Sequence, residues 1–430
     1  NGCYNEMSYF NGLQSLETAE YLMARLDKLG GPESYNHYAV GWAHALNTPY
    51  QWTKQVASHF GGTRNGTIVH WPKGIKARGE LRSQWHHVID IAPTILEAAG
   101  LPEPKRVDGI EQTPIEGVSF LYTFNDARAK DRHLVQYFEI AGNRGIYHDG
   151  WLAGTVHKAV WEAAPRASLE KDRWELYNTR TDFSLAYDLA AKHPDKLKEM
   201  QDLFMTEAVK YRVLPIDDRI QERMNAAVAG RPDLMGDRTS LTVYEGMRGM
   251  SENVFINVKN RSHSITAEVQ VPRDGVRGVV LAQGGRFGGW SLYVRDGKPA
   301  FTYNWLGLKR YTVASPKSLP SGKATIRYEF VYDGNGFGKG GSATLTVNGE
   351  KVAEGRIEGT HAFIFSPDEG ADVGLDGETP VVEDYGVPAP HRFTGKIDKV
   401  TVDVKEMEKA DKAEEDKLRA DLAGKKAMAD

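Results

Sequence analysis

The most regular pattern of apolar and polar positions lies in residues 253–404. Several short segments there alternate strictly between the two kinds of residue, which is the pattern of strands with one buried face. Asp296-Gly297 and Asn348-Gly349 separate such segments and are typical of tight hairpin turns. Regular short strands with glycine-rich turns predict an all-β sandwich of the jelly-roll type. The alternating apolar positions include Ile265, Ala267, Val269, Val271, Ile326, Tyr328, Phe330, Tyr332, Ala343, Leu345 and Val347.

The region before the predicted sandwich combines short strands with one helix. The segments HLVQYFEI, GNRGIYHDGWLAGTVH and WELYNT are predicted strands, and Asp149-Gly150 is a hairpin signal between two of them. Pro194 opens an amphipathic helix whose apolar side chains recur at helical spacing. A small antiparallel sheet covered by one helix is the simplest assembly of these pieces.

The first part of the chain alternates helix with strand. Ser15 is a predicted N-cap for a helix with apolar residues at helical spacing between residues 16 and 29. The apolar run at residues 67–71, TIVHW, predicts a buried strand, and a second helix is predicted from Pro93 to Gly100. This alternation predicts the edge of an α/β sheet.

Two further stretches show little apolar patterning. The segment before the sandwich carries several charges and is predicted to be a surface connector. The last 26 residues hold seven basic and eight acidic side chains and predict a solvated helical tail. The predicted parts of the chain are therefore residues 1–125, 126–220, 221–252, 253–404 and 405–430.

Composition narrows the classes of protein. The 430 residues carry 54 basic and 58 acidic side chains, a formal net charge of −4, which argues against nucleic acid as a partner. The sequence has no apolar run of the length that spans a membrane. A single cysteine, Cys3, excludes an internal disulfide framework and a multi-cysteine metal site. Because the chain begins at Asn1 without a signal segment, we expect either that a leader was removed or that the chain is the end of something longer. The oligomeric state cannot be predicted from these features.

The window from Lys54 to Arg64, KQVASHFGGTR, is the best candidate for chemistry. Adjacent glycines at 61 and 62 let the backbone approach another segment or a ligand closely. Lys54, His59 and Arg64 place three groups that bind anions near this bend. Sulfate and phosphate esters need a fixed cation at the non-bridging oxygens and a proton donor at the leaving oxygen. The alternative is a surface loop whose cations are only solvated.

Four blocks in residues 1–220, in the usual order and spacing, resemble the C-terminal part of the arylsulfatase family. The blocks are KQVASHFGGTRNGTIVHWP, HHVIDIAPTILEAAGLP, WELYNTRTDFSLAYDLAAKHPDKLKEMQDLF and VLPIDDR. The resemblance implies the end of an alkaline-phosphatase-like α/β catalytic domain with a small antiparallel subdomain. The predicted sandwich is similar to an extension that a bacterial subgroup of these enzymes carries.

The resemblance also implies a sulfuric ester hydrolase acting on a small sulfate ester. Its nucleophile would be a formylglycine made from a C/S-x-P-x-R signature, and its divalent cation, usually calcium, would be held by Asp and Asn oxygens. The sequence contains no C/S-x-P-x-R and no Asp-Asn-Gly metal motif, and Cys3 lies in a different context. We therefore expect no metal ligands in this chain and no turnover by the chain alone. Family members are often periplasmic or secreted.

One catalytic position carries over from the family pattern, and two neighbouring residues are further candidates. The family places a sulfate-binding lysine shortly before a Gly-Gly pair, and Lys54 precedes Gly61 by seven residues where familiar members have six. A lysine suits this task as a compact charge. His59 is the second catalytic candidate, as a donor to the bridging oxygen, with a hydrogen bond to nearby backbone as its alternative. Arg64 is a candidate for substrate binding, or for pinning the Gly-Gly turn to a carboxylate.

Other readings stay open. The sandwich is alternatively a carbohydrate-binding module on a scaffold without catalysis, for which exposed Trp290 and Trp305 would be the stacking residues. A phosphatase or phosphonate hydrolase of the same superfamily is a third possibility. The adjacent His86 and His87 are weak metal candidates, and the acidic loop ADVGLDGETPVVEDY is a weak calcium candidate.

Overall fold

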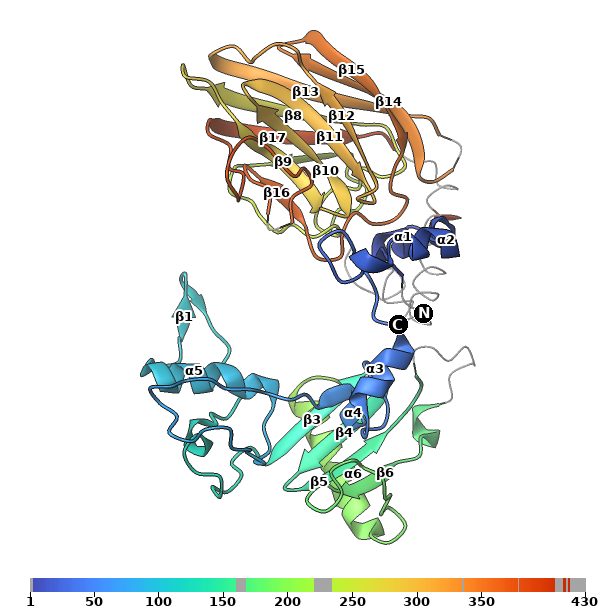
Figure 1. Cartoon of the computed structure of the whole chain (residues 1–430), viewed down its shortest axis with the longest axis vertical. Helices are drawn as coiled ribbons and strands as arrows, with labels where there is room; N and C mark the ends of the chain where they lie inside the picture. The colour runs from blue at the N-terminus through green and yellow to red at the C-terminus, as the bar shows by residue number, and fades with distance from the viewer. Residues whose placement is uncertain are drawn as a thin grey trace. The chain divides into compact units, whose positions relative to one another are not determined.

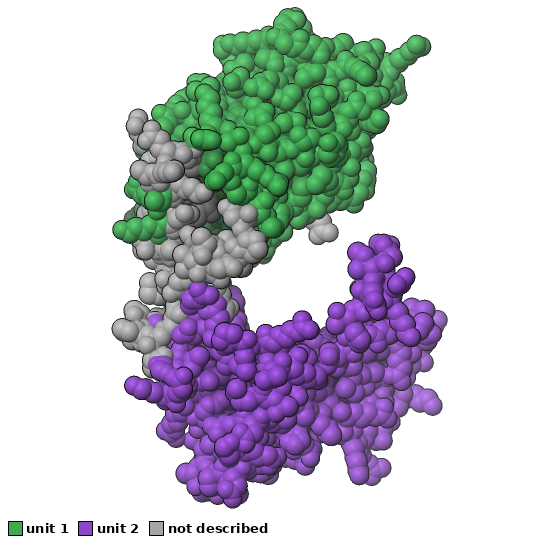
Figure 2. Space-filling view, turned by 180° about the vertical axis from the view of Figure 1, so that it is seen from behind, with its two compact units in different colours: residues 1–39, 220–430 green, residues 40–219 purple. Residues whose placement is uncertain are grey.

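A computed structural model describes residues 3–159, 168–219, 234–334, 336–377 and 379–406, together with 413, 414 and 417. The described chain is mostly β-sheet with few helices and divides into two compact units. One unit joins residues 1–39 to residues 220–430, and the other comprises residues 40–219 (Figure 2). Within the described ranges, no helix is both long and apolar enough to cross a membrane.

Two antiparallel sheets share one hydrophobic core in the first unit, as the alternating pattern predicts (Figure 1). The five-stranded sheet has the order β12-β11-β10-β9-β16, and the six-stranded sheet has the order β15-β14-β13-β8-β17-β7. The strands are β7 (Ser240–Val243), β8 (His263–Val271), β9 (Gly278–Gly285), β10 (Gly288–Arg295), β11 (Lys298–Trp305), β12 (Lys309–Ala314), β13 (Gly322–Tyr332), β14 (Lys339–Val347), β15 (Glu350–Gly359), β16 (Ala371–Val373) and β17 (Lys396–Val404).

The Asp-Gly and Asn-Gly pairs form the two tight hairpin turns that the sequence predicts for the sandwich. Asp296 and Asn348 both have positive φ angles, of 52° and 51°, and each is followed by a glycine with positive φ. The two residues therefore form the tight turns between β10 and β11 and between β14 and β15. The predicted connector differs from the structure in part, because β7 lies in it and pairs with β17. Most of the predicted charged tail lies outside the described residues.

The N-terminal segment packs on the sandwich rather than on the residues that follow it. It contains α1 (Glu6–Phe10), η1 (Gln14–Leu16), α2 (Ala19–Met23) and η2 (Leu26–Lys28). The amide of Asn5 donates to the carbonyl oxygen of Leu306 at 2.6 Å, and Asn11 accepts from the backbone N–H of Phe363 at 3.0 Å. These buried contacts place residues 1–39 with the sandwich, which differs from the single part predicted for residues 1–125.

The predicted continuous helix between residues 16 and 29 is wrong. The α-helix begins after Thr18, whose hydroxyl accepts from the backbone N–H of Tyr21, and it ends at Met23. Leu26 and Leu29 are 59% and 45% exposed, so the described residues do not bury the apolar stripe that would support a longer helix.

The second unit is built around a four-stranded antiparallel sheet of order β3-β4-β5-β6. Ile146, Ala153 and Leu176 of this sheet share a core with buried side chains of α6, which lies across the strands in Figure 1. This confirms the predicted sheet covered by one helix. The elements are α3 (Val40–Asn47), α4 (Phe60–Thr63), η3 (Val88–Asp90), α5 (Ile91–Ala99), β1 (Arg106–Val107), β2 (Ile110–Glu111), η4 (Leu121–Thr123), β3 (Val135–Ile140), β4 (Asn143–His148), β5 (Trp151–Thr155), η5 (Leu169–Lys171), β6 (Glu175–Asn178) and α6 (Pro194–Lys210).

Of the strand and the helix that were predicted between residues 67 and 100, the structure confirms only the helix. α5 ends at Gly100, whose φ of 66° is the left-handed C-cap that glycine favours. Residues 67–71 form no strand, and Ile68 is 97% exposed, so the predicted buried strand is wrong. Residues 67–71 pair with no strand of the described chain, and an apolar run without a paired neighbour is not stable as a strand.

Candidate functional site

The Lys54 loop, residues 51–62, folds tightly onto itself. Trp52 and Gln55 have φ angles of 67° and 76°, which non-glycine residues seldom adopt. A Cβ atom at Gly61 would lie 2.0 Å from the carbonyl oxygen of Trp52, and one at Gly62 would lie 2.2 Å from that of Val56. The glycine pair therefore permits a close backbone approach, as the sequence indicates. Such strained residues cluster at functional sites.

The same loop is fixed to the antiparallel sheet below it. The buried amide of Asn143 on β4 donates to the carbonyl oxygen of Gln55 at 3.2 Å. Gly154 on β5 lies so close that a Cβ there would be 2.6 Å from the carbonyl oxygen of Ser58. The sheet therefore holds the loop by backbone contacts on both sides of Lys54.

Lys54 itself is exposed. Its ammonium makes no ion pair with any side chain in the described ranges. A hollow of about 340 Å³, open to solvent, is lined by the residues just before it, Gln51, Trp52 and Thr53, and by His44 of α3. A single cation on a rigid loop beside an open hollow is suited to binding an anionic group.

His59 has a different environment from the one a proton donor to substrate would need. Its side chain is 1% exposed, its Nε2 lies 3.0 Å from Oε2 of Glu175, and its Nδ1 lies 2.9 Å from Oγ of Ser58. The hydrogen bond from His59 lowers the pKa of the Glu175 carboxyl. Both ring nitrogens are engaged inside the protein, so the imidazole joins the Lys54 loop to β6.

Arg64 also makes contacts within the protein. Its guanidinium lies over the rings of Tyr50 and Phe60, at 5.3 and 5.1 Å from their centroids. One Nη atom donates to the carbonyl oxygen of Phe183 at 3.4 Å. Arg64 therefore braces the end of α4 through aromatic rings and a carbonyl oxygen rather than through the carboxylate that the sequence suggested.

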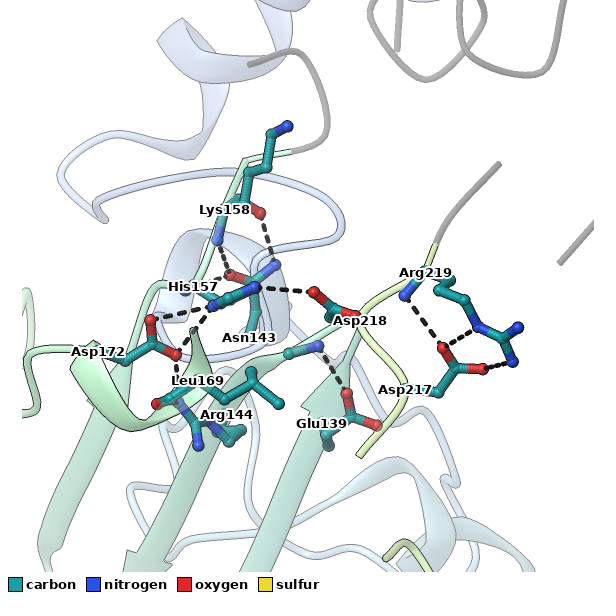
Figure 3. Close-up of polar contacts among 11 residues, drawn as sticks. Glu139, Asn143, Arg144, His157, Lys158, Leu169, Asp172, Asp217, Asp218 and Arg219 are labelled. Carbon is teal, nitrogen blue, oxygen red and sulfur yellow. Dashed lines mark hydrogen bonds and ion pairs between the residues drawn. The ribbon is translucent and has the colours of Figure 1, made fainter. Parts of the chain in front are cut away.

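A buried network of charged side chains lies beside the same sheet and was not predicted from the sequence (Figure 3). The side chain of His157 is fully buried, with Nδ1 3.0 Å from Asp172 and Nε2 3.3 Å from Asp218. Asp172 also pairs with Arg144, whose pKa is lowered by burial. Opposite charges that compensate one another in this way allow charged groups to be buried.

Asn143 links this network to the Lys54 loop. Its Oδ1 accepts from the backbone N–H of His157 at 2.9 Å, and its amide donates to the carbonyl oxygen of Lys158 (Figure 3). The same amide donates to the carbonyl oxygen of Gln55. The only sequence signal for the network is the block VLPIDDR, which supplies Asp218. The structure thus places Lys54 and His59 in one loop over the network, whereas Arg64 contacts a separate set of residues.

Comparison with known proteins gives a partial answer about ancestry. No protein-family model matches the chain. An uncharacterized sulfatase from Schizosaccharomyces pombe is 28% identical over 216 residues, which are 49% of this chain and 37% of the relative. An arylsulfatase from Klebsiella aerogenes is 30% identical over 106 residues, which are 25% of this chain and 22% of the relative.

The chain has sulfatase homology at modest identity. It spans well under half the length of these curated relatives. Among solved structures, the CBM40 module of the Ruminococcus gnavus IT-sialidase bound to α2,3-sialyllactose is 18% identical, with a TM-score of 0.27 over 43% of this chain and 97% of that chain. A Bacteroides thetaiotaomicron protein of glycosaminoglycan metabolism is 20% identical, with a TM-score of 0.30 over 48% of this chain and 46% of that chain. TM-scores this low carry no argument about function.

The two adjacent histidines differ: His87 accepts from the backbone N–H of Ile89 at 3.4 Å, whereas the buried Nε2 of His86 has no hydrogen-bond partner among the described residues. Nδ1 of His133 lies 2.8 Å from the fully buried carboxylate of Asp90, which also accepts from the backbone N–H groups of His87 and Val118. No group of three or more His, Cys, Asp or Glu side chains in the described chain could hold a metal ion.

The sandwich does not present the predicted stacking residues. Trp290 is 1% exposed, and its Nε1 donates to Gln283 at 3.1 Å inside the core. Trp305 is half-buried, and its indole packs 3.5 Å from the Cβ position of Gly359. Trp290 therefore gives no support to the carbohydrate-binding alternative, and Trp305 is only partly accessible.

The acidic loop of the sandwich is folded rather than solvated. Asp376 is 2% exposed and hydrogen-bonds the hydroxyl of Tyr385, itself fully buried. Burial raises the pKa of Asp376 to about 7. Tyr385 packs edge-on against Tyr293 at 5.0 Å, so this loop covers the outer face of the five-stranded sheet.

Proposed function

We propose that this chain supplies the sulfate-binding part of an arylsulfatase-type sulfuric ester hydrolase. The observation that carries the proposal is Lys54, an exposed ammonium between two residues with positive φ. It stands on a loop that Asn143 and His59 fix to the sheet. Sulfatase homology at modest identity supports the reaction class. The alkaline-phosphatase-like α/β fold remains part of this proposal.

The roles of the three residues follow from their contacts. The Lys54 ammonium binds the non-bridging sulfate oxygens and offsets their charge, without having to be reorganised first. His59 acts as a positioning residue, because its ring bonds Glu175 and Ser58 rather than solvent. Arg64 braces the end of the same segment. The contacts of His59 and Arg64 therefore hold in place the segment that carries the Lys54 ammonium.

The described residues do not fit a calcium site, because they contain no cluster of three or more acidic or histidine ligands. The sequence also lacks the C/S-x-P-x-R signature of the nucleophile. We therefore derive no step through a cation and propose that the chain alone binds sulfate esters without hydrolysing them. Incubation with 4-nitrophenyl sulfate should release no 4-nitrophenol above the uncatalysed rate.

The binding test uses the full chain and methyl sulfate in a ligand-observed NMR titration. Lys54→Ala should weaken binding at least tenfold, because the only cation of the loop is lost. Lys73→Ala, which removes another exposed lysine, is the matched control and should change nothing. Equal affinity of wild type and Lys54→Ala would exclude the sulfate role. Methyl phosphate bound much more tightly than methyl sulfate would favour a phosphatase or phosphonate hydrolase instead.

A further inference from the structure

The sandwich takes no part in the proposed sulfate site, but three of its loops contact the N-terminal segment (Figure 1). The helices α1 and α2 of that segment are only five residues long each, and helices this short are not stable in water by themselves. Met7 of α1 is nevertheless only 1% exposed. A segment of this length is too short to build a core of its own, so its fold depends on contacts with the sandwich.

Asn11 makes three hydrogen bonds to the loop that follows β15. Its Oδ1 accepts from the backbone N–H groups of Phe363 and Ile364 at 3.0 and 3.3 Å, and its Nδ2 donates to the carbonyl oxygen of Ile364 at 3.0 Å. Asn11 is 3% exposed, so these bonds are shielded from water. An asparagine side chain carries the same donor and acceptor as a peptide group, and it therefore pairs with this loop as a neighbouring backbone would.

Asn5 makes a second buried contact, with the turn that follows β11. Its Nδ2 donates to the carbonyl oxygen of Leu306 at 2.6 Å. Its Oδ1 accepts from the backbone N–H of Met7 at 3.0 Å, which fixes the orientation of the amide group. On the sandwich side, the backbone N–H of Leu306 donates to Nε2 of the fully buried His361 at 3.4 Å. Each side of the contact is therefore held in place by its own part of the chain.

Tyr35 makes the third contact, with the turn between β9 and β10 and with the loop after β15. Its ring stacks on that of Phe287, with centroids 5.2 Å apart and an interplanar angle of 21°. Its hydroxyl donates to the carboxylate of Asp368. Residues 5, 11 and 35 thus reach three loops of the sandwich, and a ligand contacted at three separate points is held in one orientation.

We propose that these three loops of the sandwich, at residues 287, 306 and 363–368, form a binding site for the N-terminal segment, and that the sandwich acts as an intramolecular clamp. The contacts are noncovalent, so the segment should stay bound after the backbone is cut between residues 39 and 40. The ligand of these loops is then a part of the chain itself rather than a sugar. This role does not depend on Lys54, so it can be tested independently of sulfate binding.

The test uses the full chain with a cleavage site for a specific protease inserted between Ala39 and Val40, where the two compact units meet in the sequence. After cleavage under native conditions, size-exclusion chromatography should recover the fragment that ends at residue 39 together with the rest of the chain. Asn5→Ala combined with Asn11→Ala should speed its release at least tenfold, because four hydrogen bonds to the sandwich are lost. Asn36→Ala is the matched control and should change nothing, since the side chain of Asn36 bonds Gly30 and Ser34 inside the segment.

A second measurement needs no substitution. Hydrogen exchange of the wild-type chain, before and after the cut, should show equal protection of the N–H groups of Phe363 and Ile364, because Asn11 still accepts from both. Loss of this protection after the cut, or elution of the wild-type fragment on its own, would overturn the proposal. Equal release rates in the double variant and in Asn36→Ala would show that the two asparagine contacts do not hold the segment, which also overturns it.

Discussion

The sandwich and residues 67–101 are both rich in apolar side chains, yet the sandwich buries most of them and residues 67–101 leave many exposed. Ile326 on β13 is fully buried, whereas Ile95 on α5 is 61% exposed and Ile68 is 97% exposed. β13 has hydrogen-bonded neighbours on both sides and a second sheet across the core. The comparison shows that an apolar pattern specifies burial only where the chain also supplies the opposing surface.

Residues 67–71 illustrate the other half of the comparison. Their backbone N–H groups donate no hydrogen bond within the described ranges. Apolar side chains on both sides of such a run are typical of a strand buried between two layers. The segment has the composition of a central strand and the surroundings of a surface loop. The segment just before it is held by both means, since Phe60 shares a core with the antiparallel sheet and His59 contacts Glu175.

The largest predicted effect compares the same substitution in the two regions. Ile326→Ala should lower the free energy of unfolding of the sandwich by about 2–5 kcal/mol, because it leaves a cavity in a closed core. Ile95→Ala should cost about 0.5 kcal/mol or less, because its side chain is already largely in water. Urea denaturation followed by tryptophan fluorescence measures both. Similar losses would show that α5 has a buried face after all.

The next prediction concerns pH and the folded acidic loop of the sandwich. Because burial raises the pKa of Asp376 to about 7, the fold favours the protonated carboxyl. The stability that this group contributes is present near pH 4 and is lost as the pH rises towards 7, by up to about 4 kcal/mol.

Asp376→Asn should remove this part of the pH dependence, which denaturation at pH 4, 5.5 and 7 measures. Asp384→Asn, in the same loop but exposed, is the control and should keep the wild-type slope. An unchanged slope in Asp376→Asn would show that the carboxyl is ionised in the folded protein throughout this range.

The smallest change in the free energy of unfolding is predicted for substitutions of exposed apolar residues. The same substitutions should nevertheless change the self-association of the chain. Leu81→Glu combined with Ile95→Glu should reduce self-association and dye binding by the full chain, with stability altered by no more than about 0.5 kcal/mol. Val331→Glu, on an exposed position of the sandwich, should alter neither. Size-exclusion chromatography with light scattering gives the association state. A wild-type chain that is monomeric and binds no dye would contradict this prediction.

Local signals explain which elements were predictable. Asp296-Gly297, Asn348-Gly349 and Pro194 act through the backbone preferences of a few adjacent residues, so the hairpins and α6 follow from the sequence. The Gly61-Gly62 pair likewise predicted a close backbone approach near Lys54. The longer helix between residues 16 and 29 and the strand at 67–71 failed, because their apolar residues needed partners that the pattern cannot show.

Part of the candidate site was also predictable, because some of its residues are close together in the sequence. Lys54, His59 and Arg64 lie within eleven residues, so the sequence identified their segment. His157 meets Asp172 and Asp218 across 15 and 61 residues of chain, and no local spacing indicates that meeting. The sequence left open whether Trp290 is exposed, and its position on β10 faces the core.

The sequence by itself determined the turns, the alternating strands and the lysine beside two glycines, since each depends on neighbouring residues. Tertiary structure decided which apolar residues are buried, what His59 and Arg64 contact, and that Trp52 lines a hollow next to Lys54. These outcomes depend on segments far apart in the chain, because burial and hydrogen bonding require two surfaces to meet.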